Sequence, residues 1–249
     1  MIELVKSGVV FNEENHTYFL GDKQLSGITG MIKRQLFPDK YKDVPQFVLE
    51  RAAERGTKVH HDCQFADVTG FEPESQEAVS YIMIRTGAGY SALDNEYTVS
   101  DEEHFASNID CVWEKDGTIA LADIKTTYKP DIEYLEWQLS IYAYLFEKQN
   151  PELKVSKLYG VWLYNEKSEL IPLVRKSDVE VKRLLQCEID GTRYLDTETA
   201  LEHKQDEVQL LPKDVINKYL EAVAEVERIQ PFIDGFKESL KRAMIEHDV

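Results

Sequence analysis

The sequence predicts an α/β protein in which helices flank a central mixed β-sheet. Strand-length apolar runs rich in Val, Ile, Leu and Trp recur in the middle of the chain, and segments with helical spacing of apolar residues surround them. The order helix, three strands, helix, strand is typical of a layered α/β architecture. With 249 residues, 43% of them hydrophobic, the chain is long enough to bury one substantial core.

Two short N-terminal elements are expected before this core. Residues 9–11 and 17–20 are apolar runs that flank a polar turn at 12–15, a pattern typical of a β-hairpin. Ser26 belongs to a residue type that commonly caps helices, and the residues after it predict a short helix over about 27–35.

Two further helices are predicted before the first long strand. Helical spacing begins at Gln46, and Gly56 interrupts it at a cost of about 1 kcal/mol relative to alanine. We therefore expect another backbone to approach the chain closely at Gly56. A second helical pattern covers residues 74–85, with an apolar face made of Ala78, Val79, Ile82 and Met83.

The rest of the chain alternates between strand-like and helix-like segments. Strands are predicted near residues 90–99, 105–114, 118–126, 155–164 and 169–174, and helices over 132–148 and 178–189. An Asp-Gly pair between the second and third of these strands predicts an antiparallel hairpin. We expect residues 1–190 to form the core with its N-terminal hairpin. Residues 191–249 are expected to form a C-terminal helical extension of the same domain, interrupted at Pro231.

The charge balance limits how the chain can bind nucleic acid. Its formal net charge is −17. Because non-specific affinity for DNA comes mainly from the neutralisation of phosphates, this balance argues against a strong, passive DNA binder. It remains compatible with an enzyme that holds its substrate through a bound metal ion and a local basic lining.

The sequence also indicates where the protein functions. It has no run of about 18 apolar residues and no basic N-terminal region leading into an apolar stretch, so neither a transmembrane helix nor a secretory signal is expected. Cys63, Cys111 and Cys187 form no CxxC pair, which argues against a zinc ribbon or an iron–sulfur site. A sparse, odd number of cysteines suits a reducing cytoplasm.

The predicted hairpin carries the residues with the clearest chemistry. Asp110 lies on its first strand, and Asp123 and Lys125 lie at the end of its second. Asp123 and Lys125 are two residues apart, so their side chains leave the same face of the strand. Polar groups that converge beside a hydrophobic hairpin are unfavourable unless they bind something. Carboxylates suit a divalent metal ion such as Mg²⁺, and the carbonyl of Ile124 is a candidate third ligand.

Further polar residues flank this hairpin. Gln138 and Tyr142 are four residues apart and therefore share one face of the predicted helix over 132–148. If that helix packs on the hairpin, both polar groups approach the metal site. Glu96 lies on the preceding strand, where it is either an additional metal ligand or part of a solvated strand face.

Taken together, these motifs resemble the PD-(D/E)XK nuclease superfamily, in particular its RecB-like and lambda-exonuclease-like phage-type branch. Asp110 and Asp123-Ile-Lys125 are similar to the acid and D-x-K motif, and Gln138 with Tyr142 is similar to the downstream Q-x-x-x-Y helix. The segment Arg55-Gly-Thr-Lys-Val-His60 is similar to the upstream R-G-x-x-x-H motif. The resemblance spans residues 11–142. It departs at Ile109 and Ser107, where Pro and Gly are common in this branch.

The resemblance implies a restriction-endonuclease-like core and a metal-dependent DNA nuclease. One or two Mg²⁺ or Mn²⁺ ions would be bound by Asp110, Asp123 and the Ile124 carbonyl, with His60 as a further ligand. Lys125 would position or deprotonate the attacking water, and Gln138 and Tyr142 would hold water, phosphate or Lys125.

The resemblance also implies a biological setting. It suggests an exonuclease in phage-type recombination, repair or replication, acting on DNA with a free end in the cytoplasm of a bacterial or phage-infected cell. A homo-oligomer or a recombination partner protein would fit that setting, and a membrane partner would not.

Two alternatives lead to different expectations. The acidic composition would also suit a non-catalytic protein-binding module or a DNA mimic built on a nuclease fold, which would bind neither divalent metal nor DNA. A structure-specific endonuclease would keep the chemistry but would cut a covalently closed circle, whereas an exonuclease needs an end.

Overall fold

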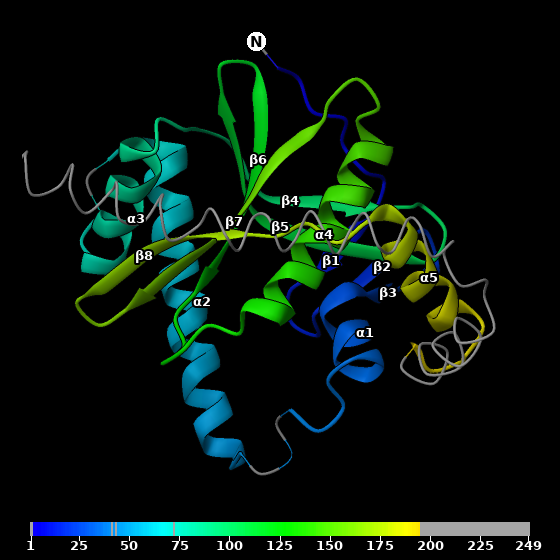
Figure 1. Cartoon of the computed structure of the whole chain (residues 1–249). Helices are drawn as coiled ribbons and strands as arrows, with labels where there is room; N and C mark the ends of the chain where they lie inside the picture. The colour runs from blue at the N-terminus through cyan, green and yellow to red at the C-terminus, as the bar shows by residue number, and fades with distance from the viewer. Residues whose placement is uncertain (1, 41, 43, 72, 195–249) are drawn as a thin grey trace, which may run out of the picture. The chain divides into compact units, whose positions relative to one another are not determined.

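The computed structural model describes residues 2–40, 42, 44–71 and 73–194, all of which fall in one compact unit of the chain (Figure 1). The helical extension expected over 191–249, with its interruption at Pro231, lies outside the described residues except for 191–194. Within the described part, no helix is both long enough and apolar enough to cross a membrane.

The described chain contains eight strands and five helices. Their order is β1 (Val10–Asn12), β2 (Thr17–Leu20), β3 (Lys23–Gly27), α1 (Ile28–Gln35), α2 (Gln46–Thr69), α3 (Gln76–Gly87), β4 (Ser91–Ser100), β5 (Phe105–Lys115), β6 (Thr118–Lys125), α4 (Ile132–Gln149), β7 (Val155–Tyr164), β8 (Lys167–Leu173) and α5 (Asp178–Ile189). Within the described residues, the N-terminal hairpin and the strands and helices expected there are confirmed to within a few residues.

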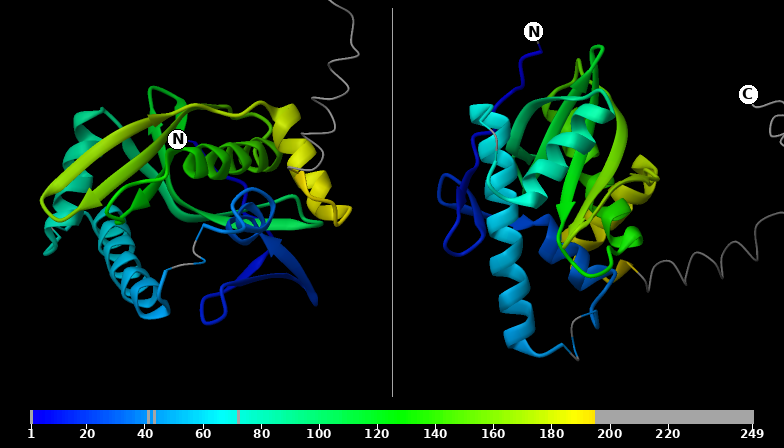
Figure 2. Two further views of the ribbon diagram at one scale, coloured as in Figure 1. Left: turned by 60° about the horizontal axis from the view of Figure 1, so that its bottom comes forward. Right: turned by 90° about the vertical axis from the view of Figure 1, so that its left-hand side faces the viewer.

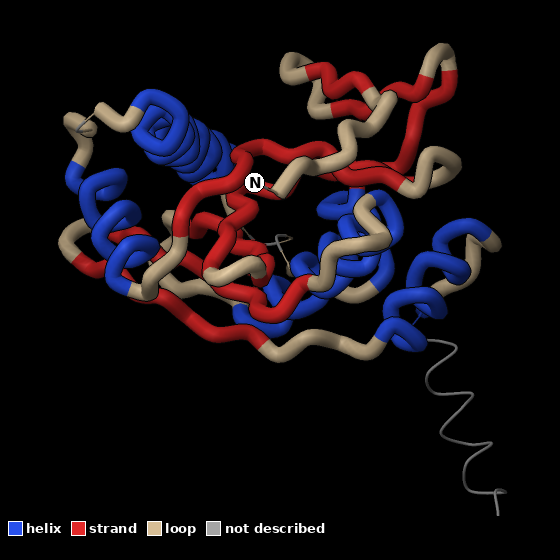
Figure 3. Tube along the Cα trace, turned by 90° about the horizontal axis from the view of Figure 1, so that it is seen from above, coloured by secondary structure: helices blue, strands red, loops and turns tan. Residues whose placement is uncertain are grey.

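All eight strands join one sheet, and the prediction of a central mixed sheet is confirmed. Its order is β1-β2-β3-β5-β6-β7-β8, and β4 pairs with β5 outside this path. The β3–β5 and β6–β7 pairs are parallel, and the other pairs are antiparallel. Figure 3 shows the strands between the two groups of helices, with the N-terminal hairpin at one side.

Helices cover both faces of the sheet (Figure 2). The larger apolar core lies between the sheet and α1, α4 and α5, where eleven residues of α4 are buried, among them Leu139 and Phe146. Side chains of α2 and α3 pack on the other face around Trp113, which is fully buried. The sheet is therefore the middle layer of three, which explains why β5 and β6 are apolar on both faces.

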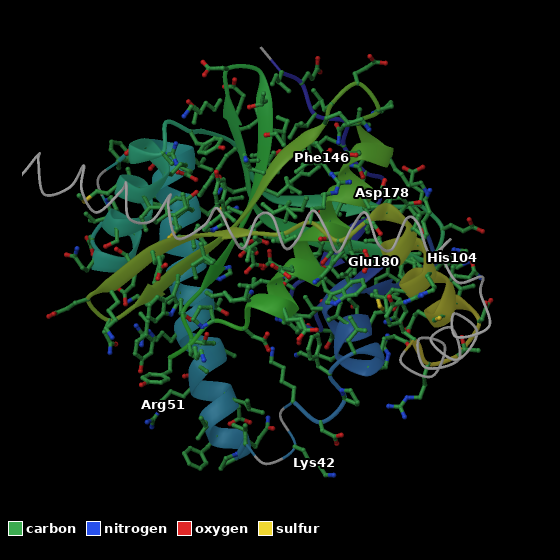
Figure 4. The ribbon with its side chains drawn as sticks, in the orientation of Figure 1. Lys42, Arg51, His104, Phe146, Asp178 and Glu180 are labelled. Atoms are coloured by element: carbon green, nitrogen blue, oxygen red, sulfur yellow. The ribbon has the colours of Figure 1, made fainter. Side chains whose placement is uncertain are left out.

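The termini of α5 and α2 show how local sequence defines these helices. Ser177 and Glu180 form a reciprocal capping box at the start of α5, and Figure 4 labels Glu180 there beside Asp178. The buried residues of α2 all lie in its C-terminal part, and its N-terminal part projects beyond the sheet (Figures 1 and 2). Arg51, labelled in Figure 4, lies on that projecting part.

The expectations for two residues, Ser26 and Gly56, were wrong. Ser26 does not cap α1: it belongs to β3, a strand that the sequence did not predict, and Gly27 is the N-cap residue. Residue Gly56 does not interrupt α2, and a Cβ at this position would lie 3.6 Å from the Thr126 hydroxyl oxygen rather than against another backbone. Such a distance is an ordinary contact, so the position has room for a methyl group.

The predicted apolar face of α3 was also wrong in part. Ala78 and Tyr81 are its buried residues, whereas Met83 is 67% exposed. Tyr81 packs near Trp113 and hydrogen-bonds within the core, so the helix turns this amphipathic residue inward.

Candidate metal centre

The centre forms where the sheet divides. Along one edge of β5, β4 pairs with residues 106–114. Along the other edge, β3 pairs with Phe105 and Ala106, and β6 pairs with residues 111–115. Residues 107–110 of β5 therefore lie between two strands on that edge. Because β6 leaves β5 after Ala122, Asp110 and Asp123 flank the opening of this fork.

The alternation of side chains is interrupted at the same point. Ile109 and Val112 both belong to the core beneath α4, whereas Cys111 and Trp113 belong to the core beneath α2 and α3. In a regular strand, Ile109 and Cys111 would share a face. The side chains of β5 therefore change face between Ile109 and Cys111, and Asp110 lies at this change.

Glu96 lies opposite this irregularity on β4. Its neighbours Asn95 and Tyr97 pair with Cys111 and Ile109, so Glu96 stands across from Asp110. The φ angle of Glu96 is +48°, in the left-handed region that a glutamate adopts at a cost on the order of 1–3 kcal/mol. Such strain persists only where surrounding structure enforces it, and here it accompanies a turn of the side chain toward Asp110.

His60, Glu96 and Asp110 converge from three elements. One potential ligand atom of each lies within 4.8 Å of the others. His60 comes from α2, Glu96 from β4 and Asp110 from β5. Within the described ranges, this is the one group of three or more His, Cys, Asp or Glu residues with such spacing.

Hydrogen bonds orient His60 and Asp110. Nε2 of His60 lies 3.0 Å from the carbonyl oxygen of Ile124, and Nδ1 lies 3.5 Å from Oδ2 of Asp110. Because a carbonyl only accepts hydrogen bonds, Nε2 of His60 donates to Ile124, and Nδ1 faces the acids. Oδ2 of Asp110 accepts a 2.8 Å bond from the backbone N–H of Ile124. Residue 124 thus orients both side chains through its main chain.

Asp123 and Lys125 form a second group on the α4 face of β6. The Lys125 ammonium is ion-paired with Oδ2 of Asp123, whose side chain is only 1% exposed. On the other oxygen, Oδ1, Asp123 accepts a 2.7 Å bond from Nε2 of Gln138. This geometry matches the expectation that Asp123 and Lys125 share a face and that α4 packs on the hairpin.

Tyr142 and Ser107 extend this group into the core. Nε2 of Gln138 also donates to the Tyr142 hydroxyl at 3.0 Å, and the Ser107 hydroxyl donates to the same oxygen at 2.8 Å. Burial raises the pKa of Tyr142 well above its usual range, so this hydroxyl stays neutral. The chain of contacts fixes the amide of Gln138 in the orientation that donates to Asp123.

The protonation behaviour of the acids fits a cation site. Burial and the neighbouring Asp110 raise the pKa of Glu96 to about 7. For Asp123, burial and Asp110 raise the pKa to about 6, and Lys125 partly opposes this shift. These closely spaced carboxylates thus repel one another near neutral pH, and a divalent cation would relieve that repulsion. Two carboxylates with one imidazole form a donor set that suits a divalent metal ion.

The structure arranges the residues singled out from the sequence in two adjoining groups. His60, Glu96 and Asp110 make up the first, and the structure places Glu96 in it, a position that the strand pattern left open. Asp123, Lys125, Gln138 and Tyr142 make up the second. The Ile124 carbonyl contacts His60, and its main chain joins the two groups.

A buried polar network behind the first group was not anticipated. Asp67 of α2 is ion-paired with Arg85 of α3 at 2.9 Å and accepts bonds from Tyr81 and from Asn95, the latter at 3.0 Å. Asn95 directly precedes the strained Glu96. The sequence signal for this network was weak, because an acid and an arginine on separate helices are usually solvated.

A search of curated proteins found no match. A solved structure described as "Crystal structure of SSO0001" aligns with 13% identity and a TM-score of 0.42, covering 69% of this chain and 77% of that chain.

The family comparison is more specific. A model described as "PD-(D/E)XK nuclease superfamily" matches residues 26–237, which include both groups of the centre. This match covers well over half of the sequence. The chain therefore belongs to the PD-(D/E)XK nuclease superfamily.

Proposed function

We propose that this protein is a deoxyribonuclease that hydrolyses phosphodiester bonds with the help of one or two Mg²⁺ or Mn²⁺ ions. The observation that carries the proposal is the junction at residue 124. The backbone of Ile124 contacts both His60 and Asp110, while its neighbours Asp123 and Lys125 form the buried ion pair. The proposed metal ligands and Lys125 are thus held together at the end of β6.

The first group supplies the metal ligands in this proposal. His60, Glu96 and Asp110 would hold one cation, and Asp123 would contribute from the adjoining group. A bound divalent cation would supply Lewis-acid stabilisation of the phosphate charge and acidify a coordinated water. Nδ1 of His60 would be the ligand nitrogen, since Nε2 donates to Ile124.

Lys125 supplies the positive charge beside the scissile phosphate. Its ammonium, held by Asp123, donates hydrogen bonds to the attacking water or to a phosphate oxygen. Gln138 restrains Asp123 and so restrains Lys125, and Tyr142 restrains Gln138. Gln138 and Tyr142 therefore act as positioning residues, whereas Lys125 touches the reacting atoms.

The resemblance to the RecB-like, phage-type branch supports a more specific proposal. We propose an exonuclease that acts on DNA with a free end, in recombination, repair or replication in the cytoplasm of a bacterial or phage-infected cell. A homo-oligomer or a recombination protein would be its partner.

The substitution Lys125→Ala tests the proposal. We expect it to lower Mg²⁺-dependent degradation of linear DNA by at least about 10²-fold, because it removes charge at the reacting phosphate. The matched control is Lys157→Ala, which removes an exposed lysine of β7 and should leave activity unchanged. Thermal unfolding of both variants checks that the fold is intact. Full activity of the Lys125 variant would refute the assigned role.

Two further measurements separate the alternatives. A non-catalytic acidic module or DNA mimic would show no saturable Mn²⁺ binding by calorimetry, whereas the proposed centre should bind Mn²⁺. A covalently closed duplex circle should resist the enzyme while the same DNA in linear form is degraded. Cutting of the circle would show that the enzyme is an endonuclease rather than an exonuclease.

A further inference from the structure

A cavity opens beside the candidate metal centre on the α4 side. Its volume is about 750 Å³. Its lining includes Lys33 from α1 and Lys40 from the segment after α1. It also includes Lys125 from the end of β6, and Tyr128 and Lys129 from the β6–α4 connection. The cavity thus gathers side chains from segments far apart in the sequence.

The lining is basic although the chain is acidic. The chain holds 46 acidic and 29 basic residues, yet four lysines and a single acid, Asp131, line this cavity. Asp131 is already ion-paired with Lys40 at 2.6 Å. Burial and the neighbouring Lys40 and Lys125 lower the pKa of Lys33, which means that these ammonium groups repel one another. Bound anions would relieve that repulsion.

The cavity is continuous with the candidate centre. Lys125 and Gln138 belong to its lining, and both contact the carboxylate of Asp123. A chain of phosphates whose reacting member lies at Lys125 would therefore place the adjacent phosphates among Lys33, Lys40 and Lys129. Lys40 is held in place for such a contact, because it also lies 4.1 Å from the centroid of the Tyr134 ring.

Tyr128 gives the lining an aromatic surface. Its side chain is 80% exposed, and its ring meets Tyr164 edge to face at 5.8 Å. The indole of Trp162 donates to the carbonyl oxygen of Thr127 at 2.8 Å, which anchors the backbone next to Tyr128. An exposed, anchored ring beside lysines is the combination used by proteins that bind single-stranded nucleic acid, where lysines bind phosphates and rings stack on bases.

We propose that this cavity binds a single strand of DNA next to the scissile phosphate. Lys33, Lys40 and Lys129 bind successive backbone phosphates, and Tyr128 stacks on a base. In a duplex, the bases are paired and stacked and are not available to Tyr128. This inference rests on the proposed nuclease function, and it deepens it by naming a single strand, including one separated at the end of a linear duplex, as the form of DNA that enters the site.

The test measures binding without turnover. Fluorescence anisotropy in EDTA at low salt follows a labelled single-stranded oligonucleotide of about ten nucleotides. The variant Lys33→Gln/Lys129→Gln replaces two positive charges with neutral amides and should weaken binding by about tenfold. It should also reduce the slope of log Kd against log salt concentration by about 0.7 for each lost phosphate contact. Tyr128→Ala should weaken binding at all salt concentrations without changing that slope.

Matched controls distinguish the cavity from general charge. Lys148→Gln/Lys182→Gln removes the same charge from two exposed lysines that lie over Tyr144. Phe71→Ala removes an aromatic side chain that is 69% exposed elsewhere. Both controls should bind like the wild type. Lys129→Gln alone, at an exposed loop position, provides a second variant in case the change at Lys33 of α1 affects folding.

The outcomes separate this inference from the proposed function. Equal affinities and salt slopes for the cavity and control variants would overturn the cavity's role, even if the wild type degrades DNA. Equally tight binding of a blunt duplex with the same loss in the Lys33/Lys129 variant would overturn the preference for a single strand. If the wild type binds the oligonucleotide through these lysines but never hydrolyses DNA, the cavity's role in binding is supported and the proposed nuclease function is refuted.

Discussion

At the residue scale, the centre depends on groups that are unfavourable by themselves. Glu96 has a strained backbone, and burial beside Asp110 raises its pKa to about 7. Asp123 is nearly inaccessible and depends on Lys125 and Gln138 for compensation. Such groups lower the stability of the metal-free protein, and a cation held between them would restore it.

The pH dependence of stability should report on Glu96. Its pKa in the folded protein lies above the ordinary value of 4.5, so the folded state binds the proton more tightly. The unfolding free energy of the metal-free protein should therefore fall as pH rises from about 4.5 to 7. Glu96→Gln removes this charge and should stabilise the metal-free protein at pH 8 by on the order of 1–3 kcal/mol.

Thermal melts in EDTA between pH 5 and pH 8 measure this effect. The advantage of Glu96→Gln should shrink toward pH 5, where the wild-type carboxyl is protonated. Adding Mn²⁺ at pH 8 should raise the melting temperature of the wild type more than that of the variant. A variant that is less stable than the wild type throughout would contradict the assigned repulsion between Glu96 and Asp110.

Tyr142 should contribute to stability through its hydroxyl group. Tyr142→Phe leaves the buried Ser107 hydroxyl and one N–H of Gln138 without their acceptor. Loss of buried hydrogen bonds should lower the unfolding free energy by about 1–3 kcal/mol, which urea denaturation would measure. Ser107→Ala is the milder comparison, because it removes one donor together with its hydrogen bond. An unchanged Tyr142→Phe protein would mean that this chain of contacts does not form.

At the element scale, α2 links the centre to the rest of the fold. It delivers His60 to the fork and, nearly two turns later, Asp67 to the buried network with Arg85. Asn95 ties this network to β4 next to Glu96. The position of α2 and the strained backbone of Glu96 are therefore coupled through side chains that lie outside the candidate metal site.

Breaking the Asp67–Arg85 pair should be strongly destabilising. Asp67→Ala leaves the Arg85 charge buried without its partner, with an expected cost of about 3–5 kcal/mol in chemical denaturation. The double variant Asp67→Leu/Arg85→Met should lose less stability than the sum of the single variants, since it leaves no buried charge unpaired. Additive losses would show that the two residues do not interact.

Gly56 offers the opposite prediction for α2. A methyl group fits there, since it would lie 3.6 Å from the Thr126 hydroxyl oxygen. Gly56→Ala should therefore raise the unfolding free energy by about 0.5–1 kcal/mol, because alanine favours the helix. Gly56→Leu should instead displace Thr126, the neighbour of Lys125, and lower nuclease activity. A destabilised Gly56→Ala protein would restore the expectation of a close backbone approach.

At the scale of the whole molecule, the acidic chain has a basic cavity beside the candidate metal centre. The net charge is −17, yet the cavity beside Lys125 has a net positive lining. We therefore expect long-range attraction of DNA to the surface to be weak, so that binding by the proposed nuclease would depend on the lysine-lined cavity together with the metal site.

Weak passive binding is a measurable consequence. In EDTA at about 0.15 M salt, blunt duplex DNA should bind with a Kd weaker than about 0.1 mM. Replacing EDTA by Ca²⁺ should tighten binding at least about tenfold, as the acidic centre becomes neutralised. Fluorescence anisotropy measures both conditions. Micromolar binding in EDTA would show that another surface of the protein holds DNA.

Local pattern was sufficient for most elements but not for those that depend on distant partners. The amphipathic helix α4 and the hairpin of β5 and β6 were predictable because periodicity and an Asp-Gly turn are local signals. The short, polar β3 was missed since its strand conformation depends on pairing with β5, about eighty residues away. That same pairing explains why Ser26 is a strand residue rather than a helix cap.

The sequence by itself determined the types and order of the chemical groups: an acid, then D-x-K, then a glutamine and a tyrosine one helical turn apart. It determined these because spacing of two and four residues defines which side chains share a face. Only the tertiary structure decided that Glu96 joins His60 and Asp110, that Lys125 pairs with Asp123, and that four lysines meet in one cavity. These contacts join separate elements, and their geometry depends on the fork in the sheet, which no local pattern specifies.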